Sequence, residues 1–260
     1  MRLFDAHNHL QDERLSGRLE AVFFDAAAVG VELMATKGCR ESDWGRVERI
    51  AAERKGVHPA FGLHPWFVEE RSREWFGRLK EALIAHPEAS VGEIGIDRAV
   101  PERVDALQER IFLEQLELAR TLERPATIHC RGAWGRLIEL LDGFGPLPRG
   151  FLIHCFGGSA ETARALVERG AMISFSGSIT RPNNRRAGEA VRAVPADRLL
   201  IETDAPDIPL HNLPSGLPRE PNEPSRLPFV LAKLAELRNE PEGDLAEITF
   251  CNAVRVFGMG

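Results

Sequence analysis

Short, mostly apolar runs recur along the whole chain, and segments with a different spacing of apolar residues separate them. Runs of about four to eight apolar residues are typical of strands that are buried on both faces. The first run begins at Leu3, and the others are Val31–Thr36, Val57–Gly62, Ala89–Ile94, Ala126–His129, Phe151–His154, Ala171–Ser176 and Arg198–Thr203. The sequence therefore predicts eight short strands.

The segments between these runs carry apolar residues about three to four positions apart, which is the spacing of one helix face. In the clearest segment, Asp105–Glu123, Leu107, Ile111 and Leu118 share a face, and Pro125 ends the helix. The other predicted helices are Leu15–Val29, Trp44–Lys55, Glu74–Ala85, Ala133–Leu141, Ala160–Arg169, Ala187–Val194, Leu227–Arg238 and Gly243–Phe257.

Eight strands that alternate with helices predict an α/β fold, the closed parallel (β/α)8 or TIM barrel, with residues 1–260 as a single domain. An open doubly wound sheet is the alternative. It usually has fewer strands and a Gly-x-Gly-x-x-Gly turn after the first strand, and this chain lacks that turn. Seven prolines from Pro206 to Pro228 exclude a helix or central strand and predict a stiff loop after the eighth strand.

Composition narrows the class of protein. Of the 260 residues, 43% are hydrophobic and 28% charged, as in ordinary soluble globular proteins, and no apolar run is long enough to span a bilayer. We therefore expect a cytoplasmic protein without membrane contact or an obligatory protein partner. The net charge of −6 argues against tight binding to duplex DNA through the backbone alone, although bound cations can supply local positive charge.

Histidines gather at the C-terminal ends of the predicted strands. Five of the eight, and two acids, occupy such positions: His7, His9, His64, Glu93, His129, His154 and Asp204. Barrel enzymes carry their chemistry at this rim. Imidazole and carboxylate groups that meet there predict a divalent metal site.

The number of candidate ligands favours two cations. Six ligands are too many for one tetrahedral zinc ion but suit two ions that share a carboxylate. The six are His7, His9, Glu93, His129, His154 and Asp204. The two oxygens of Glu93 can bridge such a pair, and Asp204 can accept the proton of an attacking water. The expected chemistry is hydrolysis by a water that two divalent ions activate, with Zn, Mn and Mg all possible.

Strand alternation predicts how the neighbours of these residues point. In the first strand, Asp5, His7 and His9 share one face, and Ala6 and Asn8 share the other. We expect Asp5 to orient a ligand imidazole; the alternative is a buried, hydrogen-bonded acid without a metal role.

The same alternation turns Cys130 and Cys155 away from the neighbouring histidines and into the helix layer, as core packing. None of the four cysteines forms a Cys-x-x-Cys pair, so neither a zinc ribbon nor a thioredoxin-like site is indicated.

Several motifs, in order, resemble the TatD family of metal-dependent hydrolases, within the amidohydrolase-like barrels. They cover nearly the full length of the chain and comprise Phe4–Leu10, Gly62–Pro65, Gly92–Asp97, Gln108–Pro125, Ile128–Arg131, His154–Ser159, Glu202–Pro206 and Asn222–Pro224. The resemblance implies phosphodiester hydrolysis, often as a deoxyribonuclease or exonuclease, with nucleic acid or a small phosphoester as substrate.

The resemblance also implies roles for individual residues. It implies a first metal held by His7, His9, Glu93 and Asp204, and a second held by Glu93, His129 and His154. His64 is implied to contact the phosphate or the scissile group, which adds it to Glu93 and Asp204 as a catalytic candidate. Departures from the family pattern occur at Gly132, Arg98 and Gly157, where Asp, Tyr and Thr or Ser are common. These rim positions affect the substrate more than the metals.

Some residues have two interpretations. Arg131 and Arg181 can bind a phosphate through the guanidinium fork or lie solvated at the surface. Trp66, Phe67 and Phe156 can stack on a base or pack beside the rim. Glu202 is interpreted as a core acid paired with an arginine, without a catalytic role, and Thr36 and Lys37 can line the pocket.

Two rival functions stay open. Many amidohydrolases that cleave a cyclic amide or lactone bridge their metals with a carbamylated lysine on the fourth strand. This chain has Glu93 there, and none of its four lysines fits, which favours the phosphoesterase. The other rival is a non-catalytic barrel whose metals are structural, and a fully ligated, closed site would support it.

Overall fold

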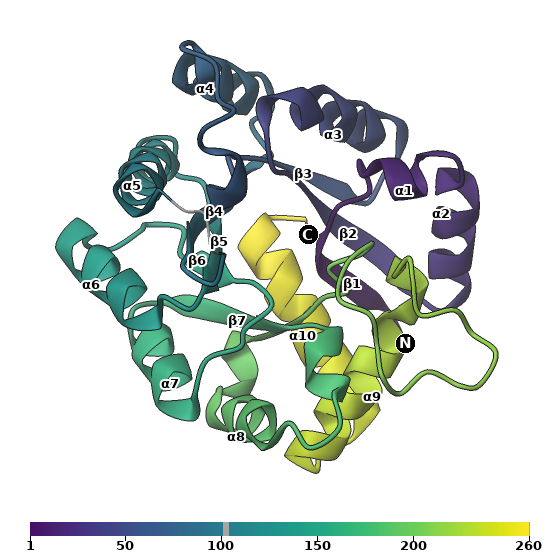
Figure 1. Ribbon diagram of the computed structural model, residues 1–260. Coiled ribbons are helices and arrows are strands. Elements are labelled where there is room, and N and C mark those ends of the chain that lie inside the picture. Colours follow the sequence, from purple (N-terminus) through teal and green to yellow (C-terminus); the bar gives the residue numbers. More distant parts are fainter. Residues whose placement is uncertain (101–103, 260) are drawn as a thin grey trace.

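The computed structural model describes residues 1–100 and 104–259, which form a barrel of parallel strands surrounded by helices (Figure 1). Its eight strands are β1 (Leu3–Asn8), β2 (Val31–Gly38), β3 (Val57–Phe61), β4 (Ser90–Asp97), β5 (Ala126–Arg131), β6 (Phe151–Ile153), β7 (Ala171–Phe175) and β8 (Leu199–Ile201). Each strand pairs in parallel with the next one along the chain, so the order in the sheet equals the order in the sequence. The predicted (β/α)8 barrel is confirmed.

Helices connect the strands on the outside of the barrel. They are α1 (Glu13–Ser16), α2 (Leu19–Ala28), α3 (Glu41–Glu53), α4 (Trp75–Ala85), α5 (Asp105–Thr121), α6 (Trp134–Phe144), α7 (Ala160–Glu168), α8 (Arg185–Ala193), α9 (Leu227–Arg238) and α10 (Glu242–Phe257). Short 3-10 helices are η1 (Pro65–Phe67), η2 (Gly177–Thr180), η3 (Ala196–Arg198) and η4 (Pro224–Arg226). No helix in the described part of the chain is both long and apolar enough to cross a membrane.

The chain segments at the C-terminal ends of β1 and β8 are hydrogen-bonded to each other, and we call this contact the β1–β8 seam. The amide of Asp204 donates to the carbonyl of His7 at 2.9 Å, and the amide of His9 donates to the carbonyl of Ala205 at 2.7 Å. The two ends of the sheet therefore meet at residues that were predicted to hold a metal.

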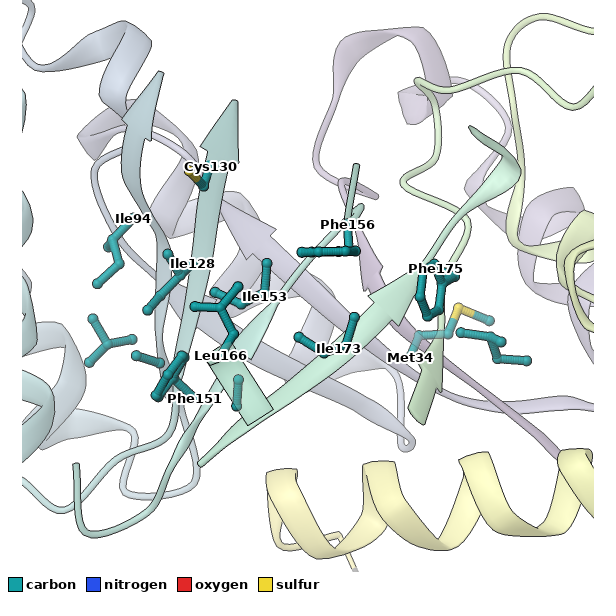
Figure 2. Close-up of a cluster of buried hydrophobic side chains, with 14 of the residues drawn as sticks. Met34, Ile94, Ile128, Cys130, Phe151, Ile153, Phe156, Leu166, Ile173 and Phe175 are labelled. Atoms are coloured by element: carbon teal, nitrogen blue, oxygen red, sulfur yellow. The ribbon is translucent and has the colours of Figure 1, made fainter. Parts of the chain in front are cut away.

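Apolar side chains form two clusters. The larger one lies between the strands and the outer helices, where Ile94, Ile128, Ile153 and Ile173 come from four successive strands (Figure 2). The smaller one lies inside the barrel and joins strand residues to α10: Phe4, Ala6, Ala35, Leu152, Met172, Leu200, Phe250, Ala253 and Phe257. Figure 2 places α10, in yellow, across the end of the barrel opposite the strand arrowheads. The floor of the barrel is therefore apolar, and its other end is free for polar chemistry.

Two boundary predictions were wrong. The helix predicted over Leu15–Val29 is divided into α1 and α2 around Gly17, whose amide bonds to Leu15 and ends the first turn. The loop predicted from Pro206 to Pro228 gives way at its end to η4 and to the first turn of α9, which contains Pro228. Proline fits the first turn of a helix because the amide it lacks has no helical partner there.

Candidate metal centre at the barrel rim

Five imidazoles and two carboxylates converge at the C-terminal rim of the barrel. They are the seven residues that the sequence placed at strand ends: His7, His9, His64, Glu93, His129, His154 and Asp204. All are buried or nearly so, and Glu93 stands at the centre of the group. We call these seven residues the donor cluster.

Each carboxylate oxygen of Glu93 faces a different set of imidazoles. Its Oε2 atom lies 3.4 Å from Nε2 of His7 and 3.5 Å from Nε2 of His9. Its Oε1 atom lies 2.6 Å from Nε2 of His154 and 3.1 Å from Nδ1 of His129. One carboxylate thus joins two histidine pairs, which is the arrangement that a bridging ligand requires.

Asp204 completes the side of the donor cluster that contains His7 and His9. Its Oδ1 atom lies 3.5 Å from Nε2 of His7 and 3.4 Å from Nε2 of His9. The ligating atoms of these three residues lie within 4.8 Å of one another. Imidazole nitrogen and carboxylate oxygen at this spacing fit a divalent cation, because metal–ligand bonds of about 2.0–2.2 Å reach all three atoms from one point.

Hydrogen bonds fix which nitrogen of two histidines is free. Nδ1 of His9 lies 2.9 Å from the carbonyl oxygen of Lys37, which can only accept, so Nδ1 carries the proton and Nε2 is free to ligate. Nε2 of His129 lies 3.0 Å from Oδ2 of Asp97. This carboxylate places the proton on Nε2 and leaves Nδ1 directed at Glu93.

His64 has the opposite arrangement. Its Nδ1 atom accepts a hydrogen bond from the amide of Trp66 at 3.1 Å, so the neutral ring carries its proton on Nε2. That nitrogen lies 3.3 Å from Oε1 of Glu93. Burial lowers the pKa of His64 to about 4, which keeps the ring neutral. His64 therefore presents a hydrogen-bond donor beside the donor cluster rather than a free lone pair.

The electrostatics of the donor cluster favour a charged acid at its centre. Burial raises the pKa of Glu93, but His154, His64 and His7 more than offset this effect, and the pKa lies well below its usual value. Burial also raises the pKa of Asp97, while hydrogen bonds from His129, Ala99 and Trp66 bring it to about 2. Both acids are therefore ionised at neutral pH, as metal ligands and their supports must be.

Backbone geometry positions two parts of the donor cluster. Asp204 has a left-handed backbone with φ 59°, which aspartate adopts more readily than most residues, and which follows directly on β8. Gly95 pairs with His129 across β4 and β5 and has φ 144°. A Cβ atom at Gly95 would stand 1.9 Å from the carbonyl oxygen of His129, so only glycine allows the two strands to approach this closely.

The prediction for Asp5 was wrong, and the alternative of a buried acid holds. The Asp5 carboxylate accepts hydrogen bonds from the amide of Thr203 at 2.8 Å and from the hydroxyl of Thr203 at 2.6 Å. It also accepts one from the side-chain amide of Asn8 at 3.2 Å. No hydrogen bond from Asp5 to an imidazole occurs among the described residues. The register of β1 shifts between Asp5 and Asn8, so simple alternation fails there, and Ala6 packs inside the barrel. Asp5 supports the β1–β8 seam instead.

Alternation was right for one cysteine and wrong for the other. Cys130 packs in the larger apolar cluster, as expected (Figure 2). Cys155 lies beyond the end of β6 with φ 44°, and its Sγ atom is 3.0 Å from Oγ of Ser176. Because the chain leaves the strand before Cys155, its side chain no longer follows the strand period.

Glu202 does not pair with an arginine as predicted. It is fully buried, accepts the amide of Cys155 at 2.5 Å, and has Oε1 at 3.6 Å from Nδ1 of His154. Burial lowers the pKa of His154, but Glu93 and Glu202 outweigh this effect and raise it well above its usual value. Glu202 therefore lies behind His154 as a buried acid, but at 3.6 Å it makes no hydrogen bond to Nδ1, whereas Asp97 lies within hydrogen-bond distance of His129.

Sequence reasoning did not assign a role to Asp97 or Cys39, and it interpreted Lys37 only as a residue that can line the pocket. Asp97 ends β4, the strand that carries Glu93, and the spacing of the two acids along this strand was the sequence signal that could have pointed to a role for Asp97. The Cys39 thiol lies 3.6 Å from Nδ1 of His9 and 3.6 Å from Oε2 of Glu93, and burial raises its pKa to about 12. The Lys37 ammonium points into the barrel, 4.3 Å from the centre of the Phe257 ring.

The remaining predicted residues end strands of the barrel or lie in the segments that follow them. Arg131 ends β5 with its side chain exposed, and Arg181 is exposed after η2. Phe156 is 2% exposed and packs in the core, which decides for the packing interpretation. Arg98, a departure from the family pattern, pairs with Asp105 and Glu109. Two other departures, Gly132 and Gly157, lie just after β5 and β6.

Comparison with known proteins places the chain in a family. The family described as TatD related DNase matches residues 4–258. An uncharacterized metal-dependent hydrolase of Bacillus subtilis, YabD, is 32% identical over 98% of this chain and 98% of its own. A 3'-5' ssDNA/RNA exonuclease TatD of Cronobacter turicensis is 33% identical, covering 98% of this chain and 97% of its own. The crystal structure of the TatD homolog YjjV from Escherichia coli superposes with a TM-score of 0.93 at 32% identity, covering 99% and 98% of the two chains. These matches over the full barrel show that the protein belongs to the family of TatD-related deoxyribonucleases.

Proposed function

We propose that residues 1–260 form one divalent-metal-dependent hydrolase domain that cleaves phosphodiester bonds of single-stranded nucleic acid. The observation that carries this proposal is the position of Glu93, whose two oxygens each face one histidine pair. The relatives named as TatD exonucleases act on single-stranded DNA and RNA, which supports the substrate class.

The donor cluster fits two cations. The first would be held by His7, His9, Glu93 and Asp204, and the second by Glu93, His129 and His154. Zn, Mn and Mg are all compatible with a mixed set of imidazole and carboxylate ligands. When bound, such ions supply Lewis acidity, which polarises the phosphate and makes a water more acidic.

Asp204 and His64 have distinct roles in the proposed reaction. Asp204 accepts the proton of the attacking water, because one carboxylate oxygen faces His7 and His9 and a second is available. His64 donates a hydrogen bond from Nε2 to a non-bridging phosphate oxygen, since its Nδ1 is engaged by Trp66. Arg131 is exposed at the end of β5, the strand that carries His129, which supports a role as a bidentate donor to the substrate phosphate.

The amidohydrolase alternative has less support. A lysine that bridges the ions would have to reach the donor cluster, and the Lys37 ammonium instead lies over the Phe257 ring at the floor. Glu93 occupies the bridging position on β4. A carboxylate bridge does not require a carbamate, so the phosphodiesterase explains the residues that are present.

A substrate panel tests the proposal. The protein is stripped with a chelator, reloaded with Zn²⁺, Mn²⁺ or Mg²⁺, and its metal content is measured by elemental analysis. We expect reloaded protein to hydrolyse labelled single-stranded DNA and a chromogenic phosphodiester, and Glu93→Gln to be inactive on both. Glu139→Gln, which changes an exposed acid on α6, is the matched control. Cleavage of cyclic amides without cleavage of any phosphodiester, or an active Glu93→Gln variant, would overturn it.

A further inference from the structure

Trp66 is a large apolar residue that is exposed directly beside the donor cluster. It lies in η1, and 50% of its surface is accessible. Its ring centre is 4.9 Å from that of His64 and 6.2 Å from that of His129. The other exposed aromatic residues in the described part of the chain are Phe24 and Phe76, and neither makes a ring contact with a histidine of the donor cluster.

Hydrogen bonds hold both the indole and the backbone of Trp66. Its Nε1 donates to Oδ2 of Asp97 at 2.8 Å, and its backbone amide donates to Nδ1 of His64 at 3.1 Å. The same Oδ2 atom accepts from His129. An exposed aromatic ring that is already held in place loses little conformational entropy when a ligand covers it.

The neighbouring aromatic residues are not available in the same way. Phe67 is half-buried and carries the Arg40 guanidinium 4.3 Å from its ring centre. Phe156 packs between Trp134 and Phe175 in the core. Of the three aromatics that the sequence offered for stacking, Trp66 alone combines exposure with contact to the donor cluster.

We propose that Trp66 is the stacking platform for the nucleobase next to the scissile phosphodiester, and this inference rests on the proposed function. A phosphate at the donor cluster places the attached nucleoside within reach of the adjacent indole. Stacking on the indole requires a base that is free of its own neighbours, as in a single strand or a frayed end. Trp66 would therefore favour single-stranded substrates without reading their sequence, because every base has a π-face.

Two variants separate stacking from the hydrogen bond to Asp97. Trp66→Phe keeps an aromatic face but loses the indole N–H, and Trp66→Leu loses both. The substrates are a single-stranded DNA oligonucleotide and versions with an abasic nucleotide on either side of the terminal phosphodiester. The quantity compared is the ratio of kcat/KM for the intact and abasic substrates.

We expect wild-type protein and Trp66→Phe to prefer the intact substrate by roughly 5- to 140-fold, which is the range that the stacking of one base on an aromatic side chain corresponds to. Trp66→Leu should bring the ratio close to one, mainly through KM. Phe24→Leu, which removes an exposed aromatic on α2, is the control and should keep the wild-type ratio. Equal losses on intact and abasic substrates would reduce Trp66 to a structural support of Asp97 and overturn the proposal.

A binding measurement separates this inference from the proposed activity. In chelator-treated protein, the same oligonucleotide should quench tryptophan fluorescence, and Trp66→Phe should lose that component of the quenching. Quenching without hydrolysis under any metal would remove the proposed function and keep the stacking site. If Trp66→Leu hydrolyses the substrates with the same intact-to-abasic ratio as the wild type, the proposed function stands and the stacking site is excluded.

Discussion

Oδ2 of Asp97 lies 3.0 Å from Nε2 of His129. The other nitrogen of the same imidazole faces Glu93 at 3.1 Å. Such a carboxylate fixes the tautomer of a metal-binding histidine and makes its free nitrogen a better ligand.

We therefore expect Asp97→Asn to weaken metal binding about 10- to 100-fold, as the loss of an outer hydrogen bond does in other metal sites. The metal concentration that gives half-maximal activity should rise, and activity should recover when the metal is saturating. Calorimetric titration of the stripped protein with Mn²⁺ gives the affinity directly. An affinity equal to that of Glu139→Gln and of the wild type would contradict the role of Asp97.

The barrel and the residues that meet at its rim could be predicted from the sequence, because both follow from strand ends. Each apolar run ends at a fixed edge of a parallel sheet, so His129 and Glu93 had to lie near each other once the strands were ordered. The roles of Asp5, Cys155 and Glu202 could not be predicted. The role of Asp5 depends on a register shift in β1. Cys155 and Glu202 lie in the segments that follow β6 and β8, where the alternation of side chains along a strand no longer applies.

Replacement of Asp204 by asparagine keeps the shape of the side chain and removes its basicity. We expect kcat to fall by about 10²- to 10⁴-fold, the usual contribution of general acid–base catalysis. Circular dichroism should show an unchanged fold, since the backbone amide of residue 204 still bonds to His7. A rate within a few-fold of wild type at saturating metal would exclude Asp204 as the proton acceptor.

Metal binding should also stabilise the fold, because the proposed ligands His7, His9 and Asp204 flank the β1–β8 seam. A cation that binds only the folded state adds about 2.7 kcal/mol to the free energy of unfolding at a concentration of 100 Kd. Denaturant unfolding with and without Mn²⁺ measures this increment. Glu93→Gln should lose most of it, and an equal increment in that variant would place the stabilising ion elsewhere.

His58 predicts a pH dependence of stability that is independent of the rim. It lies on β3 with its ring centre 4.8 Å from that of Phe257, and burial, with Lys37 and Arg124, lowers its pKa well below the usual value. The unfolded chain therefore binds more protons once the pH falls below about 6.5. The stability that a neutral His58 contributes is present above that pH and is lost as the pH falls toward its folded pKa.

Urea unfolding at pH 7.0 and 5.5 in the presence of a chelator measures this effect. As the pH falls, the free energy of unfolding of the wild-type protein should decrease more steeply than that of His58→Gln, which cannot titrate at this position. The difference between the two slopes should be up to about 1.4 kcal/mol per pH unit. Comparison of slopes rather than of absolute stabilities removes the cost of the substitution itself. Parallel slopes would mean that His58 does not contribute.

Gly95 supplies no donor atom, yet the contact of its backbone with the His129 carbonyl sets how closely β4 and β5 approach. A single methyl group at this position would wedge the two strands apart and draw Glu93 away from His129. The distance between Glu93 and His129 is thus set in part by a contact of the main chain. A mutational survey restricted to polar side chains would miss this determinant altogether.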